Sequence, residues 1–144
     1  MCGIVGYVGR RDALDIVVDA LRRMEYRGYD SAGVAILDGE GSTAIQKKAL
    51  RLENLEKQIA TVGRESLSGT TGIGHTRWAT HGKPTDRNAH PHASDDGKLA
   101  VVHNGIIENY AELRAELEDD GIEFVSETDT ETAVHLVSKY YAFG

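Results

Sequence analysis

The sequence is poor in cysteine, proline and basic charge, and each shortage excludes a class of protein. One cysteine among 144 residues cannot form an internal disulfide, which is typical of a reducing compartment. A net charge of −7 leaves no basic stripe to neutralise phosphates, so we expect no nucleic-acid partner. No apolar run approaches the length of a membrane span, and we expect no signal peptide, because the N-terminus has no basic region followed by an apolar run. We therefore expect a cytoplasmic protein that does not associate with membranes.

Two prolines and no low-complexity tract leave no sign of a linker, so we expect a single domain or part of one. Neither of the glycine-rich phosphate-binding loops occurs, so no cofactor is expected. The six histidines leave a metal-binding module built on His90 and His92 as an open alternative. Their spacings to His75, His81 and His103 match no zinc pattern, and a second cysteine is lacking, so we expect no metal.

The hydrophobic pattern predicts a mixed α+β fold. Strands are expected at residues 4–8, 34–37, 43–46, 71–76, 98–103 and 122–125, and helices at 12–24, 52–59, 107–119 and 128–137. Asp12 is expected to cap the first helix, and Thr128 with Glu131 forms the pattern of a capping box for the last one. Because hairpins join several strands, we expect layers of antiparallel sheet and helix rather than a doubly wound parallel sheet.

The single cysteine stands at position 2, directly behind Met1. Removal of Met1 would place a thiol and a free α-amine on one residue, which supplies a nucleophile and a base without any histidine. An α-amine titrates at about pH 7.7–8.0, so an appreciable fraction accepts protons near neutrality. The same residue equally fits a small buried hydrophobic side chain, so position alone does not decide its role.

Three further groups of polar residues follow predicted strands. Arg77 offers a planar guanidinium suited to a carboxylate, although a structural ion pair would also explain it. Asn104 and Gly105 can direct an amide and a backbone N–H at one oxyanion, or can form an ordinary Asn-Gly turn. Asp129 can bind an ammonium group, or can simply favour the start of a helix.

Six blocks of sequence together carry a family resemblance. They are residues 2–6 (CGIVG), 25–33 (EYRGYDSAG), 75–82 (HTRWATHG), 88–92 (NAHPH), 102–109 (VHNGIIEN) and 126–131 (SETDTE). As a set they resemble the class II, N-terminal nucleophile family of glutamine amidotransferases, in its glutamine–fructose-6-phosphate aminotransferase branch. The resemblance runs from the first residue to the last and rests on the whole set, because no single block is specific.

The resemblance implies an N-terminal nucleophile hydrolase fold, a four-layer αββα sandwich with two antiparallel sheets between helix layers. It implies that Cys2 attacks the side-chain amide of L-glutamine, with its own α-amine transferring protons, and that a γ-glutamyl thioester is then hydrolysed. Asn104 and Gly105 are expected to form the oxyanion hole. Arg77 is expected to bind the substrate α-carboxylate and Asp129 its α-ammonium. The remaining residues expected to shape the pocket are Trp78, Thr80 and His81.

Residues 1–144 are expected to be the N-terminal portion of the glutaminase domain, shortened on its C-terminal side relative to the family. The resemblance further implies sugar-isomerase domains in the full-length chain, which is expected to be a homo-oligomer that makes glucosamine 6-phosphate from fructose 6-phosphate. A different class of function also fits the sequence. The chain would then be a non-catalytic fragment that binds glutamine or packs against a partner, inactive through truncation or a retained Met1.

Overall fold

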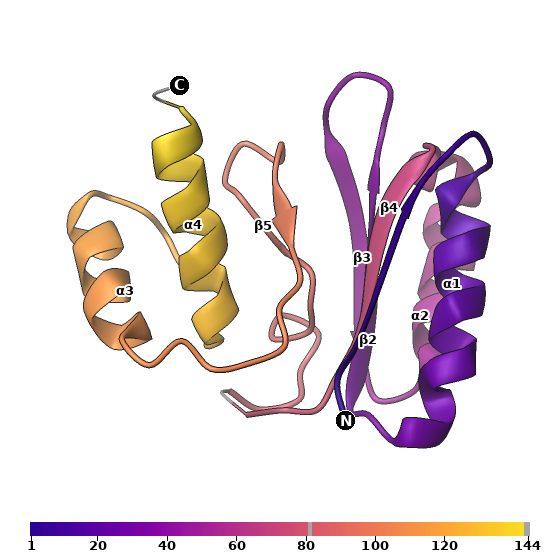
Figure 1. Cartoon of the computed structure of the whole chain (residues 1–144), viewed down its shortest axis with the longest axis horizontal. Coiled ribbons are helices and arrows are strands. Elements are labelled where there is room, and N and C mark those ends of the chain that lie inside the picture. The colour runs from indigo at the N-terminus through magenta and orange to yellow at the C-terminus, as the bar shows by residue number, and fades with distance from the viewer. Residues whose placement is uncertain (81, 143–144) are drawn as a thin grey trace.

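The computed structural model describes residues 1–80 and 82–142, with helices on both outer sides of the strands (Figure 1). In chain order the elements are β1 (Gly3–Val8), α1 (Ala13–Met24), the 3₁₀ helix η1 (Glu25–Arg27), β2 (Ser31–Leu37), β3 (Thr43–Ala49), α2 (Leu52–Val62), the 3₁₀ helix η2 (Arg64–Leu67), β4 (Thr71–Arg77), β5 (His92–Ala93), β6 (Ala100–Val101), α3 (Tyr110–Asp119) and α4 (Asp129–Tyr141). None of the helices in these residues is long and apolar enough to span a bilayer.

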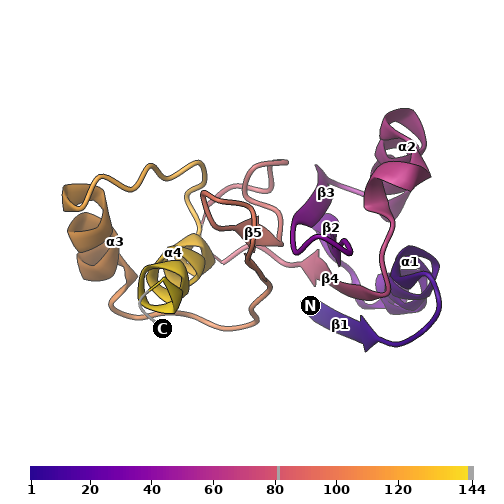
Figure 2. The ribbon, with the colours of Figure 1, turned by 90° about the horizontal axis from the view of Figure 1, so that it is seen from above.

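The main sheet is antiparallel and has the strand order β1-β4-β2-β3. Strand β4 is therefore central, and its register pairs Gly3 with Thr76 on one side and Ser31 with Arg77 on the other. This register brings the start of β1 beside the end of β4, although more than 70 residues separate them in the chain. The second sheet contains only the short strands β5 and β6, which lie between the main sheet and α4 (Figures 1 and 2).

The hydrophobic core lies between the main sheet and the helices α1 and α2. Its buried members are Ala13, Leu14, Val17, Val18, Leu21, Ala32, Val34, Ile36, Leu52, Leu55, Ile59 and Leu67. Helix α1 packs unusually close to β4, because a Cβ atom at Gly74 would lie 2.5 Å from Cγ1 of Val17. As predicted, Asp12 caps α1, since its Oδ1 accepts the backbone N–H of Leu14 at 2.9 Å.

Two strand predictions are wrong in instructive ways. The predicted strand at 98–103 shrinks to Ala100–Val101, because β5 offers only His92 and Ala93 as pairing partners. The predicted strand at 122–125 forms no strand. Phe124 packs between the helices instead, because its ring lies 4.9 Å from the His135 ring of α4 and 4.4 Å from the guanidinium carbon of Arg114 in α3. The alternation of apolar and polar residues at 122–125 fits a strand, but these residues pair with no other strand in the part of the chain that the structure describes.

The predicted starts of the last two helices, α3 and α4, also differ in part from the structure. Helix α3 begins at Tyr110 rather than at 107, and the N–H of Ile107, in the loop before it, donates to Oδ2 of Asp129 at 2.8 Å. Helix α4 begins behind Thr128 as predicted, but the capping box does not form. The Glu131 carboxylate instead accepts the backbone N–H groups of Val125 and Ser126, each at 2.7 Å. Glu131 thus fixes the loop that leads into α4.

Candidate active site

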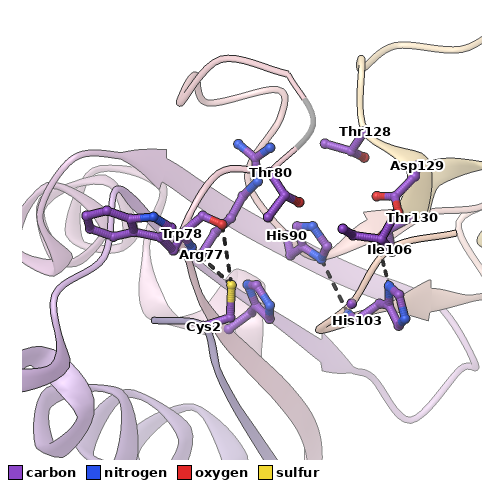
Figure 3. A pocket seen from close by; sticks show the side chains of 12 residues that line it. Cys2, Arg77, Trp78, Thr80, His90, His103, Ile106, Thr128, Asp129 and Thr130 are labelled. Atoms are coloured by element: carbon purple, nitrogen blue, oxygen red, sulfur yellow. Dashed lines mark hydrogen bonds between the residues drawn. The ribbon is translucent and has the colours of Figure 1, made fainter. Parts of the chain in front are cut away.

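A cavity of about 230 Å³ opens where the ends of β1 and β4 meet the loops before α3 and α4 (Figure 3). It is lined by Cys2, His75, Arg77, Trp78, Thr80, His90, His103, Gly105, Ile106, Thr128, Asp129 and Thr130. Six of the eight residues expected from the sequence are among them, namely Cys2, Arg77, Trp78, Thr80, Gly105 and Asp129. Asn104 does not line the cavity, and His81 lies outside the described residues.

The thiol of Cys2 is held by the backbone of Trp78. The Trp78 N–H donates to Sγ at 3.1 Å, and Sγ lies 3.5 Å from the Trp78 carbonyl oxygen (Figure 3). The indole extends away from the other lining side chains, and the Trp78 residue is 56% exposed (Figure 3). Asp30 holds the same loop from the other side, because its Oδ2 accepts the N–H of Ala79 at 2.6 Å. Sequence reasoning missed this anchoring role of Asp30, although the residue lies in one of the six blocks.

The chain end beside Cys2 is occupied by Met1. Its ammonium group donates to the carbonyl oxygen of Gly28 at 2.8 Å, and the residue is 62% exposed. With Met1 in place, the backbone nitrogen of Cys2 is an amide and cannot accept a proton. A base on Cys2 itself therefore requires that Met1 be removed.

Arg77 and Asp129 place opposite charges in the cavity, and both are almost fully buried. The Arg77 guanidinium donates to the carbonyl oxygens of Gly82 at 3.2 Å and Lys83 at 3.3 Å, which fix its orientation. Burial lowers the pKa of Arg77, and the nearby groups of Asp30, Cys2 and Asp129 oppose this shift. A ligand carrying both a carboxylate and an ammonium group would find a complementary charge for each.

Asn104 and Gly105 do not form a hairpin turn. Strand β6 ends at Val101, so these residues join no pair of strands. Gly105 has a φ of 147°, in the region that favours glycine, and it lines the cavity. The side-chain oxygen of Asn104 accepts a hydrogen bond from Nε2 of His75 at 2.7 Å. The Asn-Gly pair is therefore tied to β4 rather than to a second strand.

A family model described as a glutamine amidotransferase domain matches residues 43–142. The chain belongs to this glutamine amidotransferase family. The matched range includes Arg77, Asn104 and Asp129 but not Cys2.

Curated relatives extend the similarity to the whole chain. The glutamine–fructose-6-phosphate aminotransferase (isomerizing) of Mycolicibacterium smegmatis is 66% identical over 147 residues, covering 100% of this chain and 23% of the relative. The enzyme of the same name from Aquifex aeolicus is 60% identical over 141 residues, covering 98% of this chain and 23% of the relative. The amidotransferase chain therefore spans just under a quarter of the length of these relatives.

Solved structures confirm the fold class. Glutamine phosphoribosylpyrophosphate amidotransferase from B. subtilis matches with a TM-score of 0.75 at 27% identity, covering 96% of this chain and 29% of that one. An allosteric regulatory enzyme of purine biosynthesis matches with a TM-score of 0.76 at 28% identity, covering 96% of this chain and 30% of that one. The α+β fold of the N-terminal nucleophile amidotransferases, expected from the sequence, is confirmed, and the second sheet of this chain consists of β5 and β6.

Three buried histidines of the amidotransferase domain form a cluster that sequence reasoning did not assign to the site. The rings of His75 and His90 stack with centroids 4.3 Å apart, and the His92 ring meets His90 edge-on at 4.8 Å. Burial lowers the pKa of His75 to about 4, that of His92 to about 3 and that of His90 further still. All three imidazoles are therefore neutral near pH 7. One signal was available, because His75 lies two residues before Arg77 and so shares its face of the strand.

The metal-binding alternative gains no support from this cluster. Nε2 of His92 is hydrogen-bonded to the hydroxyl of Thr128 at 2.7 Å, and Nδ1 of His90 accepts the N–H of His103 at 3.4 Å. Within residues 1–80 and 82–142, no group of three or more potential ligand side chains is arranged to hold a metal ion.

Lys47 anchors the segment that carries His90 and His92. Its Nζ donates to the carbonyl oxygens of Arg87 at 3.2 Å, Ala89 at 2.8 Å and Pro91 at 3.0 Å. Burial lowers the pKa of Lys47 to about 8. One cation on β3 thus holds three alternate backbone carbonyls of the segment that carries His90.

The stability of the domain is expected to fall as pH drops below about 6.5. The histidine pKa values are lower in the folded state, so the unfolded state binds more protons between pH 6.5 and 4. Each such histidine is expected to contribute a slope of up to about 1.4 kcal/mol per pH unit to the free energy of unfolding. The depressed pKa of Glu131, about 2, adds a further loss as pH falls below 4.5.

Urea unfolding between pH 7.5 and 4.5 measures this slope. The variant His92→Gln keeps a hydrogen-bonding side chain but removes one titrating group, so its slope is expected to be shallower than that of the parent. A free energy of unfolding that is constant across this range would contradict the buried, neutral state of the cluster.

Proposed function

We propose that this domain hydrolyses the side-chain amide of L-glutamine and releases ammonia, with Cys2 as the nucleophile. One observation carries the proposal: a single cavity contains the thiol of Cys2, the guanidinium of Arg77 and the carboxylate of Asp129. Glutamine carries the three matching groups, which are an amide, an α-carboxylate and an α-ammonium. Membership of the glutamine amidotransferase family supports the same assignment.

The proposed reaction has two stages. The Cys2 thiolate attacks the amide carbon of glutamine, and the C–N bond breaks as the departing nitrogen takes a proton from the α-ammonium of Cys2. The γ-glutamyl thioester is then cleaved by water, whose proton returns to the α-amine, and glutamate leaves. Trp78, Thr80 and His81 are proposed to shape the pocket around the substrate.

The names of the curated relatives, glutamine–fructose-6-phosphate aminotransferase (isomerizing), support a proposal for the fate of the ammonia. In the complete protein, sugar-isomerase domains are proposed to use it to convert fructose 6-phosphate to glucosamine 6-phosphate. Residues 1–144 are then the N-terminal portion of the glutaminase domain. The complete protein is proposed to be a homo-oligomer.

The test is a direct assay of glutamate and ammonia with three substrates. L-Glutamine is expected to be hydrolysed, whereas L-asparagine and glutaramate, which lacks the α-ammonium, are expected to be poor substrates. The intact mass of the preparation must show that Met1 has been removed. Tight binding of glutamine without turnover in such a preparation would favour the non-catalytic alternative.

Arg77→Ala is expected to raise the KM for glutamine far more than it lowers kcat. The guanidinium meets the α-carboxylate in the ground and transition states alike, so its loss removes uniform binding. Truncating one partner of a buried charge pair costs about 2–5 kcal/mol, which is at least about thirtyfold in kcat/KM. Arg87→Ala is the matched control, because Arg87 is an exposed arginine whose ion pair with Glu127 is 3.5 Å long. An unchanged KM in folded Arg77→Ala protein would refute the assignment.

A further inference from the structure

We infer that His75 is a positioning residue that fixes the rotation of the Asn104 side-chain amide, so that its NH₂ group faces the developing oxyanion. The inference rests on the proposed function and deepens it. An asparagine side chain carries its oxygen and its NH₂ on opposite sides of one carbon. Because Nε2 of His75 lies 2.7 Å from Oδ1, the imidazole occupies the oxygen side and the NH₂ projects the other way.

The loop between β6 and α3, which carries Asn104, needs a contact that holds it in place. Strand β6 ends at Val101 and α3 begins at Tyr110, so no sheet or helix ladder holds the residues between them. Asn104 and Gly105 are both exposed at the surface. A catalytic hydrogen-bond donor must be held within about 0.5 Å of its productive position, and a loop alone does not achieve this.

His75 is rigid enough to provide it. The residue lies in the central strand β4, paired with Ile4 of β1 and Gly33 of β2, and it is fully buried. Its ring is stacked on that of His90 at 4.3 Å with an interplanar angle of 15°. The imidazole therefore has no freedom to follow a moving loop.

The two stacked rings hold successive residues of the loop. His90 accepts the backbone N–H of His103 at 3.4 Å, while His75 donates to the side chain of Asn104 (Figure 3 shows the first of these bonds). His103 is also tied to α4, because its Nδ1 lies 3.4 Å from the hydroxyl of Thr130. The loop is thus pinned on both sides of the peptide bond that precedes Asn104.

The protonation state agrees with this role. Burial lowers the pKa of His75 to about 4, so the ring is neutral and carries one N–H near pH 7. Nδ1 of His75 is buried and has no hydrogen-bond partner among the described residues. An N–H left unpaired there would be costly, so the proton belongs on Nε2, where Oδ1 of Asn104 accepts it.

The kinetic experiment compares His75→Leu with His75→Gln. Leucine removes the donor, so kcat is expected to fall by about a hundredfold or more, as for loss of an oxyanion donor, with the KM for glutamine within a few-fold. Glutamine places an N–H near the position of Nε2 and is expected to retain kcat within about tenfold of the parent. The double variant His75→Leu/Asn104→Ala is expected to be no slower than Asn104→Ala, because the imidazole acts only through the amide.

The inference would be overturned if the double variant lost kcat by the product of the two single losses. It would also be overturned by a His75→Leu variant that melts at a lower temperature but keeps the parent kcat. A second measurement does not need turnover. In protein labelled with ¹⁵N-histidine, the His75 signal, assigned by its loss in His75→Gln, is expected to show the neutral Nε2–H tautomer at pH 7. An Nδ1–H tautomer would overturn the inference even if the domain is an active glutaminase. Conversely, the Nε2–H tautomer in a protein that does not hydrolyse glutamine would leave the bond intact and reject the proposed function.

Discussion

Cys2→Ala is expected to reduce glutamine hydrolysis by a factor on the order of 10⁶, which is the scale of loss seen when a catalytic nucleophile is removed. The thiol is the only cysteine of the chain, it lines the cavity, and its sulfur is held by the backbone of Trp78. No other side chain in the cavity lining offers a thiol. The substitution deletes one sulfur atom from a partly exposed site, so the melting temperature is expected to change little. Steady-state release of glutamate and thermal unfolding, measured on the same preparation, separate the two effects.

A second variant tests the role of the α-amine rather than the thiol. A chain with an N-terminal extension that cannot be removed keeps the Cys2 side chain but turns its nitrogen into an amide. Such a protein is expected to be as inactive as Cys2→Ala, because the proton acceptor is lost while the nucleophile stays. Full glutaminase activity in a preparation whose mass shows a retained Met1 would contradict the mechanism.

Local signals in the sequence were sufficient where the structure depends on neighbouring residues. Asp12 caps α1 as predicted, and the turn after β2 closes the hairpin with β3 because Asp38 accepts the N–H groups of Glu40 and Ser42, each at 2.8 Å. Asx turns of this kind are encoded within a few residues. They can therefore be predicted without knowing the rest of the fold.

The wrong predictions depended on contacts that a local pattern does not contain, either with another strand or with the preceding loop. The pattern at 98–103 suits a strand, but only two residues of β5 are available to pair with it. Thr128 and Glu131 have the spacing of a capping box, yet the carboxylate binds the N–H groups of Val125 and Ser126 instead. Competition of this kind is decided by the path of the preceding loop, which a spacing rule does not contain.

The candidate site could likewise be predicted only in part from the sequence. The candidate residues were recognised by their residue types, and the cavity lining contains six of the eight that were predicted. Their convergence depends on the register that pairs Gly3 with Thr76, which no local pattern reveals. The buried histidines were missed for a related reason. A histidine becomes a neutral hydrogen-bond donor through burial, and burial of His75 and His90 is a property of the assembled sheet and loops.

Neutral histidines also shape the electrostatics of the cavity. Protonated imidazoles beside Arg77 would compete with it for a carboxylate, and their charges would repel the guanidinium. With His75 and His90 neutral, Arg77 and Asp129 are left as the charges that define the orientation of a zwitterionic ligand. The amide of such a ligand would then be directed toward the thiol of Cys2.

Asn104→Ala is expected to lower kcat by about a hundredfold to a thousandfold while the KM for glutamine stays within a few-fold. The tetrahedral intermediate carries an oxyanion that the ground-state amide lacks, so a donor directed at that charge stabilises only the transition state. The competing explanation is structural, since Asn104 is bonded to His75 and its removal leaves a buried donor unpaired. That explanation predicts a lower melting temperature with the activity per folded molecule preserved.

The matched control for Asn104 is Asn54→Ala. The amide of Asn54 donates to the carbonyl oxygen of Ala49 at 3.3 Å, in α2 and away from the cavity lining. Its loss is expected to affect stability alone, which calibrates how far a broken asparagine bond reduces turnover indirectly. If both variants lose similar stability and only Asn104→Ala loses kcat, the amide acts on the reaction itself. If Asn104→Ala is destabilised but fully active per folded molecule, the oxyanion hole must be built from Gly105 and other donors.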